Sequence, residues 1–118
     1  MLIASLLIIF IAVLHLYILI LQTALWTKPA GRRAFGLTED FARASKVLAA
    51  NQGLYNGFLA AGLIFGLMQG EAGRIFAIFF LTCIFVAGIF GAMTASRKIL
   101  FIQAVPAALA LAAVYAGI

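Results

Sequence analysis

The chain has 118 residues, of which 67% are hydrophobic and 9% charged, with a net charge of +5 and a mean hydropathy of +1.23. Soluble domains average roughly 45–50% apolar and 25% charged residues, so this composition excludes an ordinary soluble domain and indicates an integral membrane protein. The length allows about four spans of about 20 residues each and leaves no room for a separate soluble domain.

The positive charge does not indicate nucleic-acid binding, because the basic side chains flank apolar runs instead of forming a patch. We interpret them as topology signals and as contacts to membrane lipids with anionic head groups. They are Lys28, Arg32, Arg33, Arg43, Lys46, Arg97 and Lys98. Cys83 is the single cysteine, which excludes an intrachain disulfide and a cysteine-based metal site.

Four apolar stretches predict an all-α fold, an antiparallel bundle of four transmembrane helices in one domain covering residues 1–118. The first stretch lacks the basic start of a signal peptide and ends at Trp26-Thr27-Lys28-Pro29, so we expect a retained span. A basic loop over residues 27–46 follows it. The expected spans cover about residues 2–25, 47–69, 74–95 and 99–117.

Within the basic loop, Thr38 is a candidate N-cap, with Glu39 and Asp40 in the first turn of a short helix that runs into the second span. The first loop carries five basic residues and the third carries Arg97 and Lys98. By the positive-inside rule these loops face the cytoplasm. We therefore expect a multi-pass membrane protein with both termini outside.

Small residues recur at every fourth position in three of the spans, which lets helix backbones approach closely. With three such stripes in so small a chain, we expect one to form a subunit interface in a homo-oligomer. The stripes are Ala49, Gly53, Gly57 and Ala61; Cys83, Ala87, Gly91 and Ala95; and Ala104, Ala108, Ala112 and Ala116.

Hydrogen-bonding side chains gather in the half of the spans nearest the basic loops, with one histidine near the middle. In the second span they form an arc about 140° wide at 100° per residue. This shared depth predicts a polar pocket that opens toward the cytoplasm and holds a small polar or amphipathic ligand. The candidate ligand-binding residues are His15, Gln22, Asn51, Gln52, Tyr55, Asn56 and Gln103.

Each of these residues also has a purely structural interpretation. Amides and tyrosine hydroxyls in membrane bundles often only bond neighbouring helices. His15 fits an interhelical bonding group as well as a ligand. Arg43, Arg97 and Lys98 are candidates for contacting an anionic group at the mouth of the pocket, although topology anchoring is the simplest interpretation of Arg97 and Lys98.

Several kinds of chemistry have no residues to support them. No Asp or Glu lies inside a span, which argues against a proton-driven cation exporter. The sequence has no Ser-His-Asp set, no metal-spaced His or Cys cluster and no phosphate loop. We expect neither a metal nor a cofactor.

The segment from Lys46 to Phe58, with His15-Leu16-Tyr17, the Gly31–Leu37 stretch and Ser96-Arg97-Lys98-Ile99, resembles the bacterial four-span family catalogued as domain of unknown function thirteen-oh-four. The resemblance covers nearly the whole chain. It implies a small integral protein of the bacterial inner membrane without an assigned activity.

A second, weaker similarity is to the membrane-associated eicosanoid and glutathione metabolism proteins, which are trimeric four-span bundles. Arg43, Asn51 and Asn56 fall in a stretch comparable to the motif that opens their second span, but the Glu and His of that motif are missing here. The resemblance implies a glutathione- or lipid-using transferase, with Arg43 and Arg97 holding an anionic cosubstrate and Tyr55 supplying a hydroxyl. Three hypotheses follow: a ligand-binding or transport-related protein, this transferase, or a structural membrane subunit.

Overall fold

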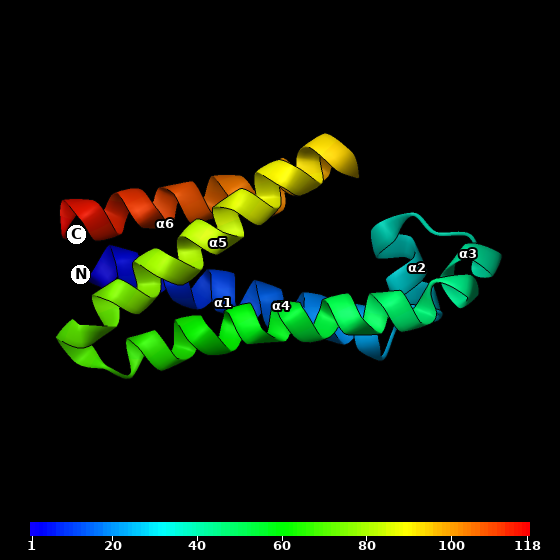
Figure 1. Cartoon of the computed structure of the whole chain (residues 1–118), viewed down its shortest axis with the longest axis horizontal. Helices are drawn as coiled ribbons and strands as arrows, with labels where there is room; N and C mark the ends of the chain where they lie inside the picture. Colours follow the sequence, from blue (N-terminus) through cyan, green and yellow to red (C-terminus); the bar gives the residue numbers. More distant parts are fainter. The chain divides into compact units, whose positions relative to one another are not determined.

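The computed structural model describes residues 1–118 and is entirely helical, with no strand. The helices follow one another along the chain as Figure 1 colours them. Their bounds are α1 (Leu2–Thr23), α2 (Pro29–Phe35), α3 (Glu39–Ala44), α4 (Lys46–Leu67), the 3₁₀ turn η1 (Gly70–Ala72), α5 (Gly73–Thr94), the π-helical turn η2 (Leu100–Ala104) and α6 (Val105–Ala116). The chain forms two compact units, residues 13–60 and residues 1–12 with 61–118.

Two stretches are long and apolar enough to cross a membrane. They cover Leu2–Thr23, with a hydropathy of 2.8, and Gly70–Thr94, with a hydropathy of 2.6. The last apolar stretch, Leu100–Ala116, is shorter. Although α4 has the same length of 22 residues as α1 and α5, its Asn and Gln side chains make it less apolar.

In the unit of residues 13–60, the basic loop forms two short helices. Pro29 stands in the first turn of α2, and Gly36 ends the helix with a φ of 65°, a left-handed conformation that glycine adopts without steric cost. The Thr38 side chain accepts a hydrogen bond from the backbone N–H of Phe41, so the predicted N-cap of α3 is confirmed. The helix that starts at Glu39 does not run into the second span as predicted, because α3 ends at Ala44 and α4 begins at Lys46.

Trp26 holds this end of the unit together. Its side chain is buried with Ala42 and Ala49, and its ring centroid lies 4.9 Å from that of Phe35. The indole Nε1–H donates to the Ser45 Oγ at 3.0 Å, at the break between α3 and α4. Trp26 is thus a packing residue of the loop and not only the aromatic end marker that the sequence suggested.

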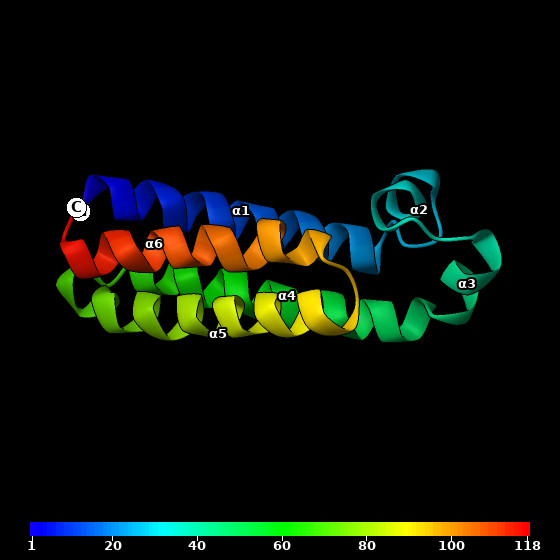
Figure 2. The same cartoon turned by 90° about the horizontal axis from the view of Figure 1, so that it is seen from above.

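In the other unit, α5 packs against η2 and α6, which lie beside it in Figure 2. The closest approach is at Gly88, where an added Cβ would lie 2.5 Å from the backbone nitrogen of Ala104. Within η2 the Val105 N–H bonds the carbonyl of Leu100, five residues back. Pro106 lacks an N–H and its ring clashes with the preceding turn of a regular α-helix, so a π-helical turn here is physically reasonable.

The four-residue stripes in α5 and α6 pack only in part: Ala104 lies buried against Gly88, and Gly91 lies against Ile99. Ala108, Ala112 and Ala116 are exposed, as are Ala87 and Ala95. A step of four residues turns 400° at 100° per residue, so such a stripe drifts by about 40° at each step and leaves the contact face. The buried positions alternate steps of three and four instead. In α5 and α6 they include Ala77, Leu81, Ile84, Gly88, Ala107, Ala110 and Val114.

Candidate functional site

Two of the predicted polar residues meet in the unit of residues 13–60. The Asn56 Nδ2 of α4 donates to the Gln22 Oε1 of α1 at 2.7 Å, and also reaches the backbone carbonyl of Gln52 at 3.2 Å. Glycines make this contact possible, since a Cβ on Gly53 would lie 2.9 Å from the Gln22 Cβ and one on Gly57 would lie 3.2 Å from a Leu19 methyl. The close approach expected for this stripe is confirmed at both glycines.

The other predicted polar residues of α4 do not join this pair. Asn51, Gln52 and Tyr55 are exposed, and their side chains make no hydrogen bond within the chain. The ring of Tyr55 instead lies edge-on to Phe58 on the same helix, with centroids 6.0 Å apart. This part of the polar arc therefore faces outward from the single chain.

The remaining ligand candidates lie on other elements than α4. His15 is fully buried within α1, the one buried residue of the chain with a polar side chain. Gln103 is half-buried in η2 and belongs to the other unit.

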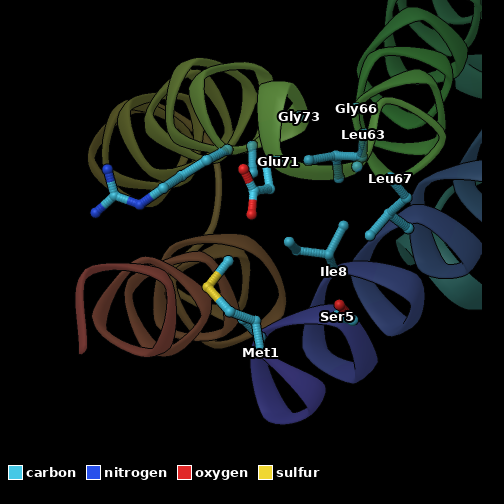
Figure 3. Close-up of a pocket in the computed structure, with 12 residues that line it drawn as sticks. Met1, Ser5, Ile8, Leu63, Gly66, Leu67, Glu71 and Gly73 are labelled. Atoms are coloured by element: carbon cyan, nitrogen blue, oxygen red, sulfur yellow. The ribbon is translucent and has the colours of Figure 1, made fainter. Parts of the chain in front are cut away.

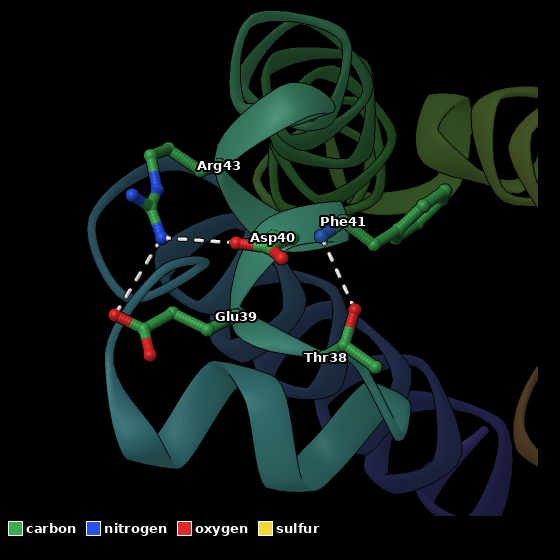
Figure 4. Close-up of polar contacts among 5 residues, drawn as sticks. All are labelled: Thr38, Glu39, Asp40, Phe41 and Arg43. Carbon is green, nitrogen blue, oxygen red and sulfur yellow. Dashed lines mark hydrogen bonds and ion pairs between the residues drawn. The ribbon is translucent and has the colours of Figure 1, made fainter.

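The basic candidates lie on exposed segments. Arg43 pairs with two carboxylates of its own helix, Asp40 at 3.4 Å and Glu39 at 3.6 Å (Figure 4). Arg97 and Lys98 are exposed between α5 and η2. The Arg43 guanidinium therefore lies beside two carboxylates of its own helix, on an exposed segment.

A groove that sequence reasoning missed lies in the unit of residues 1–12 and 61–118. It has a volume of about 300 Å³ and is formed by the start of α1, the end of α4, η1 and the start of α5. Its lining is mostly apolar, with three glycines at the turn. The lining residues are Met1, Ala4, Ser5, Ile8, Leu63, Gly66, Leu67, Gly70, Glu71, Gly73, Arg74 and Ala77.

The charged side chains that line the groove, Glu71 and Arg74, lie in η1 and in the first turn of α5. Figure 3 shows the Glu71 carboxylate directed into the groove, toward the space between Met1 and Ile8. Glu71 takes part in no ion pair, whereas the Arg74 guanidinium lies over the ring of Tyr115, 5.5 Å from its centroid. The groove thus combines mostly apolar walls with the Glu71 carboxylate, which has no ion-pair partner, and with Arg74 and the N-terminal residue Met1.

The predicted pocket did not include this groove, because its residues are polar side chains inside the spans, whereas most of the groove's lining is apolar. Its sequence signal is Gly66, Gly70 and Gly73 on both sides of Glu71, since glycines at three- and four-residue spacing leave space where two helices meet. No group of three or more His, Cys, Asp or Glu side chains is arranged to hold a metal ion.

Comparisons with known proteins bear on the whole chain. The family described as "Protein of unknown function (DUF1304)" matches residues 9–115. The chain is also 31% identical over 103 residues to a protein of Lactococcus lactis subsp. lactis (strain IL1403) described as "Uncharacterized protein YpaA", an alignment that covers 86% of this chain and 87% of that protein. No solved structure matches the chain. These similarities confirm the family that the residues around Asn51 suggested, and the chain belongs to the DUF1304 family of proteins of unknown function.

Proposed function

We propose that this protein crosses the membrane four times and holds an amphipathic molecule with a cationic head group in the groove beside Glu71. The first support is the surface of the long helices. On α1, Leu2, Leu6, Phe10 and Val13 are each more than half exposed. A soluble monomer rarely exposes contiguous apolar patches of this kind, whereas lipid-facing helices require them.

The proposed spans are α1, α4, α5 and η2 with α6. A helix of 22 residues is about 33 Å long, enough for a hydrocarbon core of about 30 Å. Charge supports the orientation, because the loop of α2 and α3 carries five basic residues and the α5–η2 connection carries two, whereas the turn at η1 carries only Glu71 and Arg74. The basic loops would face the cytoplasm, and the groove would open toward the opposite side.

The groove carries the ligand part of the proposal. A volume of about 300 Å³ is at the lower end of the range of small-molecule sites, enough for a head group and the first part of an alkyl chain. The walls suit the alkyl chain, and the unpaired Glu71 carboxylate suits a cation. In this proposal the site recognises the head group electrostatically and the chain by apolar contact.

Binding of a dodecyltrimethylammonium probe to the protein in uncharged maltoside micelles tests this assignment. We expect saturable binding of the probe. Glu71→Gln should raise its dissociation constant up to about fivefold, because the substitution removes one partly exposed ion pair. The control Glu39→Gln should leave binding unchanged, because Glu39 lies in the other unit and pairs with Arg43. Isothermal titration calorimetry measures both affinities.

A dodecyl sulfate probe provides the opposite test. The net charge of +5 alone would favour the anionic probe. If the sulfate binds as tightly as the ammonium, or if Glu71→Gln and Glu39→Gln behave alike, Glu71 does not define a cation site.

A structural role is the second candidate, and the bond between Gln22 and Asn56 favours it for those two residues. The Asn56 amide donates to the Gln22 amide oxygen across the α1–α4 contact, which fixes the register of the two helices. A ligand around Asn51 and Tyr55 stays a prediction. The transferase hypothesis gains no support from Arg43, whose guanidinium already pairs with Glu39 and Asp40.

A further inference from the structure

Two of the six side-chain amides of the protein have no partner. Gln22 and Asn56 bond each other, Gln69 donates to the Phe65 carbonyl, and Gln103 also has an interaction partner. Asn51 and Gln52 alone make no side-chain hydrogen bond, and both are exposed near the start of α4. In a membrane span, an amide that faces lipid is unfavourable, so these two side chains call for a partner outside the single chain.

The unpaired amide Asn51 belongs to a regular seam, defined here as Leu48, Asn51, Tyr55 and Phe58. The steps between these residues are three, four and three, the spacing of helices that pack as a left-handed pair. All four are exposed, with 73% for Leu48, 53% for Tyr55 and 54% for Phe58. The seam is thus a contact face of coiled-coil type that nothing in the chain covers.

The exposed threonines of the long helices do not demand a partner in this way. Thr23, Thr82 and Thr94 each donate to the carbonyl four residues back on their own helix. Their polar atoms are satisfied in lipid, and the exposed faces of α1 and α5 around them are mainly apolar. The amide-bearing face of α4 is therefore the surface best suited to protein contact.

We propose that a second copy of this chain docks on the seam, so that two α4 helices pack across a two-fold axis parallel to the membrane normal. Copies inserted in the same orientation have parallel α4 helices, and the two-fold axis then brings each seam residue opposite its own counterpart. An amide both donates and accepts, so Asn51 can pair with Asn51 of the partner copy. Tyr55 can do the same through its hydroxyl group.

The depth of Asn51 strengthens this pairing. Asn51 and Tyr55 lie about 7 and 13 Å along the axis from Lys46, which places both inside the hydrocarbon region when Lys46 is at its edge. In that region no water is available to replace the hydrogen-bond partner of an amide. One polar residue at a seam position also fixes the register and the number of helices that pack together. The proposal rests on the membrane part of the proposed function and is independent of the groove.

Disulfide cross-linking in native membranes tests the seam directly. In a Cys83→Ala background, Leu48→Cys, Tyr55→Cys and Phe58→Cys should each give a strong dimer band after oxidation. The controls Leu54→Cys and Ala61→Cys lie on exposed positions of α4 outside the seam and should cross-link several-fold less. Equal cross-linking at seam and control positions would overturn the proposal.

A second measurement does not depend on cysteines. Native mass spectrometry of the protein released from lipid nanodiscs should show two copies. Asn51→Leu should raise the dissociation constant of the dimer roughly tenfold, because it removes two interhelical hydrogen bonds and each of them changes that constant about threefold. Gln69→Leu is the matched control, because Gln69 bonds its own helix. A monomer, a trimer, or equal effects of the two substitutions would contradict the two-fold seam. The groove experiment with Glu71→Gln is unaffected by any of these results.

Discussion

Replacing Trp26 by alanine is expected to lower the free energy of unfolding by about 3–5 kcal/mol, the usual cost of removing a buried aromatic side chain. Trp26 is only 9% exposed, packs on Ala42 and Ala49, and holds Phe35 against the same cluster. Its removal leaves α2 and α3 without their shared packing partner. Far-UV circular dichroism during titration with dodecyl sulfate in mixed micelles measures the change.

Trp26→Phe separates packing from hydrogen bonding. It keeps an aromatic ring but removes the indole N–H, so we expect a smaller loss of about 1 kcal/mol. The Ser45 hydroxyl keeps its own bond to the Phe41 carbonyl at 2.7 Å and is not left unsatisfied. A Trp26→Ala protein that unfolds within about 0.5 kcal/mol of the parent would show that the basic loop does not depend on this residue.

Replacing Gly73 by alanine is expected to cost about 3 kcal/mol, near the upper end for overpacking. A Cβ at this position would fall on the carbonyl oxygen of Gly66, a backbone atom that cannot move without separating α4 from α5. Because Gly66 and Gly73 both line the groove, the same substitution should also disturb binding of an alkylammonium probe. Unfolding and calorimetry on one preparation measure the two effects.

Gly57→Ala is the matched control for Gly73→Ala. Its added Cβ would meet only the end of the Leu19 side chain at 3.2 Å, which can move. The gain in helix propensity of up to about 1 kcal/mol offsets that adjustment, so we expect little change. Equal destabilisation by the two substitutions would contradict the close backbone approach at Gly73.

Much of the helical fold could be predicted from the sequence because its signals are local. The long apolar runs indicated helices, and the Thr38 cap followed from a hydroxyl placed before Glu39 and Asp40. The separate helix α2 was missed although Pro29 and Gly36 are typical of a helix start and a helix end. The break at Ser45 was not predictable, because it depends on a hydrogen bond from Trp26, 19 residues away.

The candidate site was less predictable than the fold. Helical periodicity placed Asn51, Tyr55 and Asn56 on one arc, but it could not say which part of the arc faces α1. Only the position of Gly53 and Gly57 against α1 decides that Asn56 turns inward and Asn51 outward. The groove depends on how two helix ends meet at η1, a tertiary feature that the glycines around Glu71 permit but do not determine.

The proposed function and the proposed dimer both depend on four membrane crossings, and cysteine accessibility in spheroplasts tests these crossings most directly. In a Cys83→Ala background, Ala34→Cys, Ala72→Cys and Ser96→Cys place one exposed thiol in α2, η1 and the α5–η2 connection. Four crossings with the basic loops inside predict that an impermeant maleimide labels only Ala72→Cys until the cells are lysed. Equal labelling of Ala34→Cys and Ala72→Cys in intact spheroplasts would contradict the account.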